Sequence, residues 1–350
     1  MIKFDSVSNM IGWQHSLRSL LTWFFNPRTK YLTLEGDHVV KMVANHLSKS
    51  YEFFDSSLFE TQHVIKKPRL FDPKSYLAHD FSYRKPVVDL CDFVKARIEP
   101  YVTHFFLHGS LATMDYCKGW SDLDTFVVVS RQAIKDVSAQ IRLRDAFIDA
   151  YEYLLMVDPL QHHGFIFITE YDLDLYPSIF MPPVVFDRAL SLLSEEKEIV
   201  LNLRDSTEEA KSNIYYWQKV LTKALDTGYF EHHAYNGEYL KGSYSNADNG
   251  MYQFKYLLGL NLLLPGYFLE IKGEPSYKRD SFLRCEGMFD PKIWEIVEKA
   301  STIRALWPER EIHPYQGNAI PSWVQDIIGP DYFEESLRLI NRMIQQIGTK

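Results

Sequence analysis

The sequence predicts an α/β fold, in which a core with a small mixed sheet is joined to helical regions on both sides. Within the core, segments with helical periodicity alternate with short apolar runs typical of strands, which is the pattern of α/β proteins. After Pro182 and Pro183 the apolar residues recur mainly at helical spacing. We therefore expect three parts: an N-terminal helical and irregular extension (1–85), the core (86–182) and a C-terminal helical bundle (183–350).

The N-terminal extension is expected to contain two helices. The first ends before Pro27 and carries four apolar residues at helical spacing, Leu17, Leu20, Leu21 and Phe24. Asp37 is a suitable cap for the second helix. The basic and apolar stretch 63–72 contains Pro68 and is interpreted as a loop. No function is assigned to this extension.

The core begins with a helix, because Pro86 suits a first helical turn and Pro100 ends the apolar stripe that follows it. The further elements expected in the core are a strand at 101–107, a short helical connector, a strand at 122–129, a long amphipathic helix at 132–156 and a strand at 162–169. This order of helices and strands predicts a small mixed sheet.

The candidate functional residues of the core lie around the connector. Gly109 and Ser110 follow the first strand and precede a helical segment, where backbone amides can approach a phosphate without a side chain in the way. Asp122 and Asp124 are two residues apart, which on a strand places both carboxylates on one face. Two such carboxylates favour a hard divalent cation between them. The pattern therefore indicates phosphoryl or nucleotidyl transfer.

These features resemble the DNA polymerase beta-like nucleotidyltransferase superfamily, in which a hydrophobic strand ending in Gly-Ser is followed, after a short helix, by Asp-x-Asp leading a second hydrophobic strand. The matching residues are Gly109, Ser110, Asp122 and Asp124, with Ser121 just before the pair. The resemblance implies an enzyme that moves a nucleoside monophosphate from a nucleoside triphosphate, such as ATP, to a hydroxyl acceptor. It also implies Mg²⁺ or Mn²⁺ on Asp122 and Asp124, one ion activating the acceptor hydroxyl and one stabilising the pyrophosphate leaving group.

The superfamily usually has a third carboxylate on the last strand of this core, and here the strand 162–169 contains none. Three explanations remain open. His163, or its neighbour His162, could take that position as a metal ligand or general base, and we favour His163. Asp172 or Asp174 could fold back onto the site, or catalysis could be degraded. The segment 172–174 is itself interpreted as a solvated hairpin or loop, because Pro177 interrupts the chain soon afterwards.

The C-terminal region is expected to be helical from residue 184 onwards. Ser206 and Glu209 have capping-box spacing at the start of a helix that Gly228 ends. The further elements expected are a polar loop at 229–250, an apolar helix at 251–264 that ends at Pro265, a helix starting at Asp290 and Pro291, and a last helix at 333–347. Such a bundle is similar to that of the small-molecule and antibiotic nucleotidyltransferases, and the resemblance implies that Lys278 contacts the triphosphate.

The composition indicates which acceptor and which cellular compartment to expect. The chain has 350 residues with a formal net charge of −8 and shows no basic run, so we expect a small-molecule acceptor rather than nucleic acid. Its 3 cysteines are widely spaced, which favours reduced thiols in the cytoplasm. No apolar stretch approaches a membrane span, and the N-terminal one lacks a cleavage site, so no membrane association or secretion is expected.

Two alternatives to a small-molecule nucleotidyltransferase follow from the same motif. The first is a nucleotide-binding or regulatory protein that has lost turnover, which the missing third carboxylate motivates. The second is an enzyme that transfers the nucleotide to a protein, since only the acceptor would differ. The negative net charge disfavours polynucleotide tailing.

Overall fold

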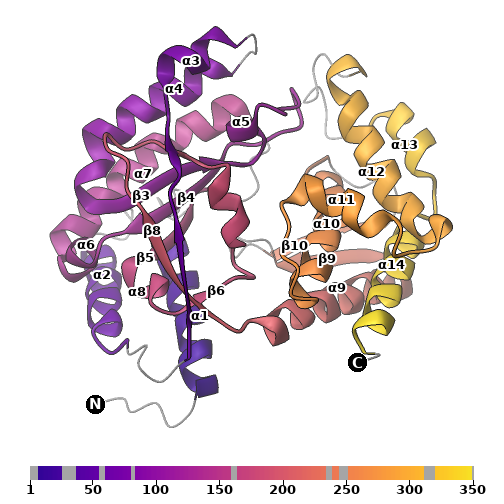
Figure 1. Cartoon of the computed structure of the whole chain (residues 1–350), viewed down its shortest axis with the longest axis horizontal. Helices are drawn as coiled ribbons and strands as arrows, with labels where there is room; N and C mark the ends of the chain where they lie inside the picture. Colours follow the sequence, from indigo (N-terminus) through magenta and orange to yellow (C-terminus); the bar gives the residue numbers. More distant parts are fainter. Residues whose placement is uncertain are drawn as a thin grey trace. The chain divides into compact units, whose positions relative to one another are not determined.

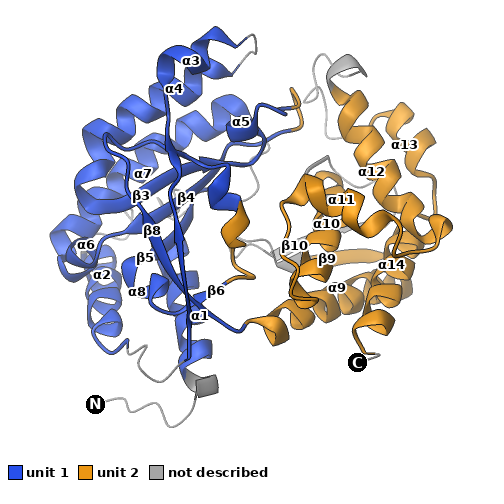
Figure 2. Ribbon diagram, viewed as in Figure 1, with its two compact units in different colours: residues 1–116, 121–177, 185–205 blue, residues 117–120, 178–184, 206–350 orange. Residues whose placement is uncertain are grey.

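The computed structural model of the chain describes residues 7–25, 37–54, 60–79, 83–158, 164–233, 239–243, 251–310 and 320–348. The chain divides into two compact units (Figure 2). Unit 1 comprises residues 1–116, 121–177 and 185–205, and unit 2 comprises residues 117–120, 178–184 and 206–350. This division differs from the three parts expected from the sequence, because the N-terminal extension belongs to the same unit as the core and the chain returns to that unit after Pro183.

The main sheet of unit 1 is mixed, as predicted, and has the strand order β2-β7-β3-β4-β5. Figure 1 labels its strands β3, β4 and β5. Its strands are β2 (Arg69–Leu70), β7 (Leu190–Ser191), β3 (Val102–His108), β4 (Asp124–Val129) and β5 (Ile166–Thr169). The centre of the sheet combines an antiparallel pair, β3 with β4, and a parallel pair, β4 with β5.

Helices of unit 1 cover one face of this sheet. They are α1 (Val7–Phe25), α2 (Asp37–Tyr51), α4 (Arg84–Phe93), α6 (Arg131–Lys135) and α7 (Val137–Val157). Their apolar side chains form one core with alternate residues of the strands, among them Phe105, Val127 and Phe167. The ring of Phe25 lies 5.2 Å from that of Phe167, which places the N-terminal helix against β5. The N-terminal helices are therefore part of the core domain rather than an appendage.

The helices near α4 and α7 differ in detail from the prediction. After α4 the chain continues as a π-helical segment, Val94–Ile98, and a 3-10 turn, Glu99–Tyr101, before β3 begins. The predicted helix 132–156 is two helices, because Asp136 has extended backbone and caps α7 by accepting from the N–H groups of Ser138 and Ala139.

A second sheet of unit 1 has the order β1-β8-β6. Its strands are β1 (Gln62–Lys66), β8 (Ile199–Arg204) and β6 (Tyr176–Pro177). The prediction of a loop at 63–72 is therefore wrong, since β1 and β2 lie there. The prediction that the chain is helical from residue 184 is also wrong for β7 and β8. These strands pair with segments remote in the sequence, and that pairing rather than local periodicity stabilises them.

Unit 2 is mainly helical, with α9 (Thr207–Thr227), α10 (Met251–Ile271), α11 (Lys278–Glu286), α12 (Pro291–Arg310), α13 (Ser322–Ile328) and α14 (Tyr332–Ile347). Pro265 lies inside α10 rather than ending it. Because α10 packs against α9, α11 and α12, burial outweighs the hydrogen bond that a proline removes. Ser206 makes no capping hydrogen bond to α9, and its hydroxyl bonds Ser178 instead.

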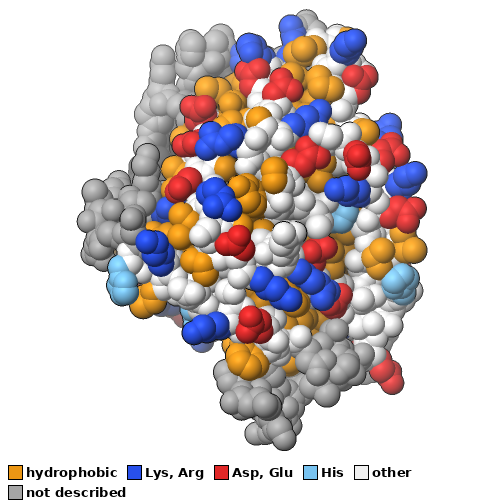
Figure 3. Space-filling view, turned by 90° about the vertical axis from the view of Figure 1, so that its left-hand side faces the viewer, with side chains coloured by type: hydrophobic (Ala, Val, Ile, Leu, Met, Phe, Trp, Pro, Cys, Tyr) orange, Lys and Arg blue, Asp and Glu red, His pale blue; other side chains and the backbone are white. Residues whose placement is uncertain are grey.

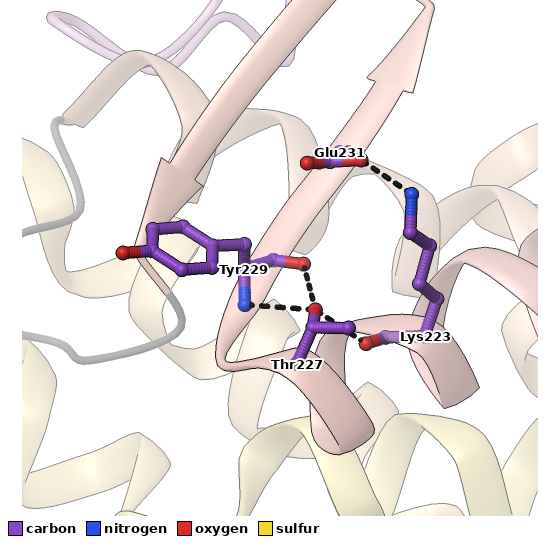
Figure 4. Close-up of polar contacts among 4 residues, drawn as sticks. All are labelled: Lys223, Thr227, Tyr229 and Glu231. Carbon is purple, nitrogen blue, oxygen red and sulfur yellow. Dashed lines mark hydrogen bonds and ion pairs between the residues drawn. The ribbon is translucent and has the colours of Figure 1, made fainter.

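The polar loop expected at 229–250 contains a described hairpin, β9 (Tyr229–His233) with β10 (Tyr239–Ser243). Gly228 ends α9, as predicted; its backbone is left-handed, and β9 follows at once. Figure 4 shows how the helix end and the strand are joined: Lys223 bonds Glu231 at 2.5 Å, and Thr227 bonds the backbone of Tyr229.

The described surface of unit 1 carries charges of both signs. On the face of unit 1 drawn in Figure 3, basic and acidic side chains are interspersed and separated by apolar and neutral ones, without a broad field of one sign. No helix among the described residues has the length and apolarity needed to cross a bilayer.

Candidate functional site

The β3–α5–β4 segment brings together the residues that the sequence singled out. The short helix α5 (Gly109–Thr113) directly follows β3, and the chain returns antiparallel as β4. In this register His108 lies opposite Asp124, so Gly109 is the next residue beyond the pair. The Gly-Ser break and the second aspartate are therefore close because β3 and β4 pair directly on either side of the connector.

Gly109 packs directly against the Asp124 carboxylate. A Cβ atom on Gly109 would lie 2.1 Å from Oδ2 of Asp124, 3.0 Å from its Cγ and 3.2 Å from its Cβ. Gly109 also has a φ of +67°, a conformation that residues with side chains rarely adopt. Two independent features, close approach and positive φ, therefore require glycine at this position.

Asp124 is the first residue of β4 and lies on the sheet face opposite the helical core. Asp124 shares its strand face with Phe126, whose ring contacts Phe186 at 5.3 Å on that side. Asp122 precedes the strand, which begins at Asp124 rather than at residue 122 as predicted. Both aspartates are partly exposed while Leu123 between them is fully buried. This pattern of exposure is suited to carboxylates that bind a ligand from solvent.

The backbone of α5 is held by two hydroxyl groups. The Thr113 hydroxyl lies 3.1 Å from the Gly109 carbonyl oxygen and also contacts the Asp115 carboxylate. The hydroxyl of Tyr76, from α3 (Pro73–Ala78), donates to the Leu111 carbonyl oxygen at 3.0 Å. Met114 ends α5 with a φ of +61°, the one positive value among the non-glycine residues that the structure describes. Sequence reasoning missed Tyr76 and Thr113, because an isolated Tyr or Thr gives no signal in a single sequence.

The register of β5 decides whether a later aspartate completes the site. β5 runs parallel to β4 with Thr169 opposite Val129. Val129 lies five residues from Asp124 along β4, a distance of about 16 Å at roughly 3.3 Å per residue. Asp172 accepts from the Thr169 backbone N–H at 2.8 Å, and Asp174 pairs with Arg131, the residue that begins α6 just beyond β4. The fold-back explanation is therefore wrong, because both aspartates lie at the other end of the strand.

Asp172 has a structural environment of its own. It is fully buried in the short helix α8 (Glu170–Leu173), where it forms a capping box with Thr169. Its carboxylate also accepts from the Gln14 amide at 3.2 Å and from the Tyr51 hydroxyl at 3.3 Å. Burial raises the pKa of this carboxyl group, and the nearby Arg18 opposes that shift. The interpretation of 172–174 as a solvated loop is wrong, and Asp172 instead joins the N-terminal helices to β5.

The structure does not test the remaining predicted site residues. His162 and His163 lie outside the described residues. Lys278 is the first residue of α11 in unit 2 and is exposed. Within the described ranges, no group of three or more His, Cys, Asp or Glu side chains is arranged to hold a metal ion.

The two-carboxylate set nevertheless fits Mg²⁺. This ion keeps several water ligands and is commonly bound through one or two carboxylates together with the phosphate oxygens of a substrate. Asp122 and Asp124 would supply that number of protein ligands, and both are partly exposed.

Comparison with known proteins adds no assignment. No protein-family model matches the chain, and neither the curated proteins nor the solved structures contain a match.

Proposed function

We propose that this protein is a metal-dependent nucleotidyltransferase that moves a nucleoside monophosphate from a nucleoside triphosphate to a hydroxyl acceptor, with a small molecule as the favoured acceptor. The observation that carries the proposal is the contact between Gly109 and the Asp124 carboxylate at the junction of β3, α5 and β4. It places one glycine, which has no side chain, beside a partly exposed carboxylate, and triphosphate and cation binding use these two elements.

Each residue has a defined role in this proposal. Asp122 and Asp124 hold Mg²⁺ or Mn²⁺, and the backbone of Gly109 and Ser110 lies against the phosphates. The bound ion, when present, neutralises charge on the phosphates and lowers the pKa of the attacking hydroxyl. His163 takes the place of the third carboxylate, as a ligand or as the group that accepts the hydroxyl proton.

A direct assay tests the proposal. The protein is incubated with each of the four labelled ribonucleoside triphosphates and with Mg²⁺ or Mn²⁺, and release of pyrophosphate is measured together with label on small molecules, on protein and on RNA. Transfer to a small molecule supports the proposal, and label on the protein instead identifies a protein-modifying enzyme. If a triphosphate binds but no pyrophosphate is released with small molecules, protein or RNA as acceptors, the proposed nucleotidyltransferase activity is contradicted. That result supports a nucleotide-binding protein.

The carboxylate pair provides the matched variants. Asp122→Asn and Asp124→Asn each keep the size of the side chain and remove a charged oxygen ligand, so we expect turnover to be lost while the fold is retained. Full activity in either variant, measured on protein with an unchanged circular dichroism spectrum, would show that this residue is not a metal ligand.

A further inference from the structure

The segment that carries Gly109 is fixed by contacts from outside its own backbone. α5 contains five residues, too few for a helix to be stable by itself. Leu111 is fully buried, and the hydroxyls of Thr113 and Tyr76 hold the carbonyls of Gly109 and Leu111. The carbonyls of two of the five residues are thus held by side-chain hydroxyls. One of these hydroxyls, that of Tyr76, belongs to the N-terminal extension.

The bond at Gly109 bears directly on the site. The Gly109 Cα, its carbonyl and the Ser110 N–H belong to one planar peptide unit. A hydrogen bond to the carbonyl oxygen therefore orients the Ser110 N–H and holds the Gly109 Cα where it meets Asp124. Gly109 packs directly against the Asp124 carboxylate. A movement of this peptide therefore displaces the carboxylate or opens a gap beside it.

The Thr113 hydroxyl also connects the two ends of α5. Its single proton is shared between two acceptors, the Gly109 carbonyl oxygen at the start of the helix and the Asp115 carboxylate, which follows the left-handed turn at Met114. A threonine inside a helix commonly bonds the carbonyl four residues earlier. Here the hydroxyl also lies against Asp115, so it bridges the two ends of the Gly109–Asp115 segment.

Tyr76 holds the same unit from α3. Its ring is buried and packs on Phe71 with 4.7 Å between the ring centres, so the hydroxyl has little freedom to leave Leu111. Burial raises the pKa of the Tyr76 phenol, which keeps the hydroxyl protonated and therefore a donor at physiological pH. α3 thus has a specific contact with the candidate site.

We propose that Tyr76 and Thr113 are positioning residues, whose hydroxyl groups hold the Gly109–Thr113 backbone in register with Asp124 and thereby set the affinity of the site for metal and triphosphate. This inference rests on the proposed function. It gives the N-terminal extension a role at the site, through α3.

The test uses variants that remove a hydroxyl and little else, Tyr76→Phe and Thr113→Val, with Thr113→Ser as the rescue variant that restores the hydroxyl. Binding of Mn²⁺ is measured by electron paramagnetic resonance, first with Mn²⁺ alone and then with a nonhydrolysable ATP analogue present. Since a typical hydrogen bond changes an equilibrium constant by about threefold to tenfold, we expect Mn²⁺ affinity in the presence of the analogue to fall by that factor in each variant. Thr113→Ser should restore wild-type affinity.

Two control variants separate positioning from stability. Tyr51→Phe removes a buried tyrosine hydroxyl of unit 1 that bonds Asp172 at the other end of the sheet. Thr227→Val removes a threonine hydroxyl that bonds the carbonyl four residues earlier in α9 (Figure 4). Both controls lose the same chemical group, and we expect their thermal stability to fall while Mn²⁺ affinity is unchanged.

The outcomes are distinct. If the wild-type protein binds neither Mn²⁺ nor the analogue, the proposed function fails. If the wild-type protein binds both, and folded Tyr76→Phe and Thr113→Val bind as tightly as the two controls, the positioning role is wrong while the proposed function stands. A loss in Thr113→Val that Thr113→Ser does not restore also contradicts the positioning role, since shape rather than the hydroxyl would then be responsible.

Discussion

Replacement of Gly109 by alanine is the sharpest test of the site, because the structure gives the size of the conflict. The new Cβ would lie 2.1 Å from Oδ2 of Asp124, and contacts under 3.0 Å are essentially never seen for real Cβ atoms. The Asp124 carboxylate must therefore retreat by about 1 Å, a displacement that costs on the order of 10²-fold in rate at a catalytic site. Rotation of the carboxylate alone does not relieve the contact, since Cγ and Cβ of Asp124 are also close, at 3.0 and 3.2 Å.

The same substitution carries a cost in stability that has to be separated from the effect on the site. An alanine at a φ of +67° costs about 1–2 kcal/mol. Gly228 is the matched control, because its φ is +74° and no atom lies within 4 Å of a Cβ built there. Gly228→Ala therefore carries the backbone strain without the steric conflict.

The assay compares the two variants at equal folded concentration, by Mn²⁺ titration with the nonhydrolysable ATP analogue and by pyrophosphate release. We expect Gly109→Ala to lose at least as much free energy of unfolding in urea as Gly228→Ala, because it adds the steric conflict to the backbone strain, and only Gly109→Ala to lose roughly 10²-fold in turnover. Equal activity of Gly109→Ala and Gly228→Ala would refute the reasoning, since the conflict with Asp124 would then have no functional consequence.

Further predictions concern the histidines and the buried aspartate. His163→Ala should reduce turnover by roughly 10²-fold or more and remove the acidic limb of the pH profile, whereas His162→Ala should have little effect; equal effects of the two would contradict a specific role for His163. Asp172→Ala should lower the free energy of unfolding in urea by at least about 3 kcal/mol, because it leaves several buried donors without an acceptor, while Asp174→Ala, which breaks a partly exposed ion pair, should lower it by about 1 kcal/mol or less. Burial raises the pKa of Asp172 in the folded protein, so the unfolded chain loses this proton at a lower pH, near 3.9. The contribution of Asp172 to stability is therefore greatest below that pH and falls as pH rises through the folded pKa; Asp172→Asn should remove this fall, and an unchanged pH dependence of unfolding would show that the raised pKa does not affect stability.

The sequence determined those features that local periodicity and spacing encode. The apolar stripe of Leu17, Leu21 and Phe24 identified α1, because its side chains recur on one face of a helix and are buried there. The strand, Gly-Ser break, short helix and Asp-x-Asp identified the β3–α5–β4 unit, because all of these residues are close together in the chain. The mixed sheet followed from the alternation of these elements.

Only the tertiary structure decided the features that depend on partners remote in the sequence. β2 and β7 are two residues long and have no periodicity of their own, so only their pairing makes them strands. Asp172 is buried because Gln14, 158 residues away, and Tyr51 provide its hydrogen bonds. The contact of Gly109 with Asp124, and the hydroxyls of Thr113 and Tyr76 that hold this backbone, depend on distances that no spacing in the sequence specifies, because they arise from how three elements pack on one sheet.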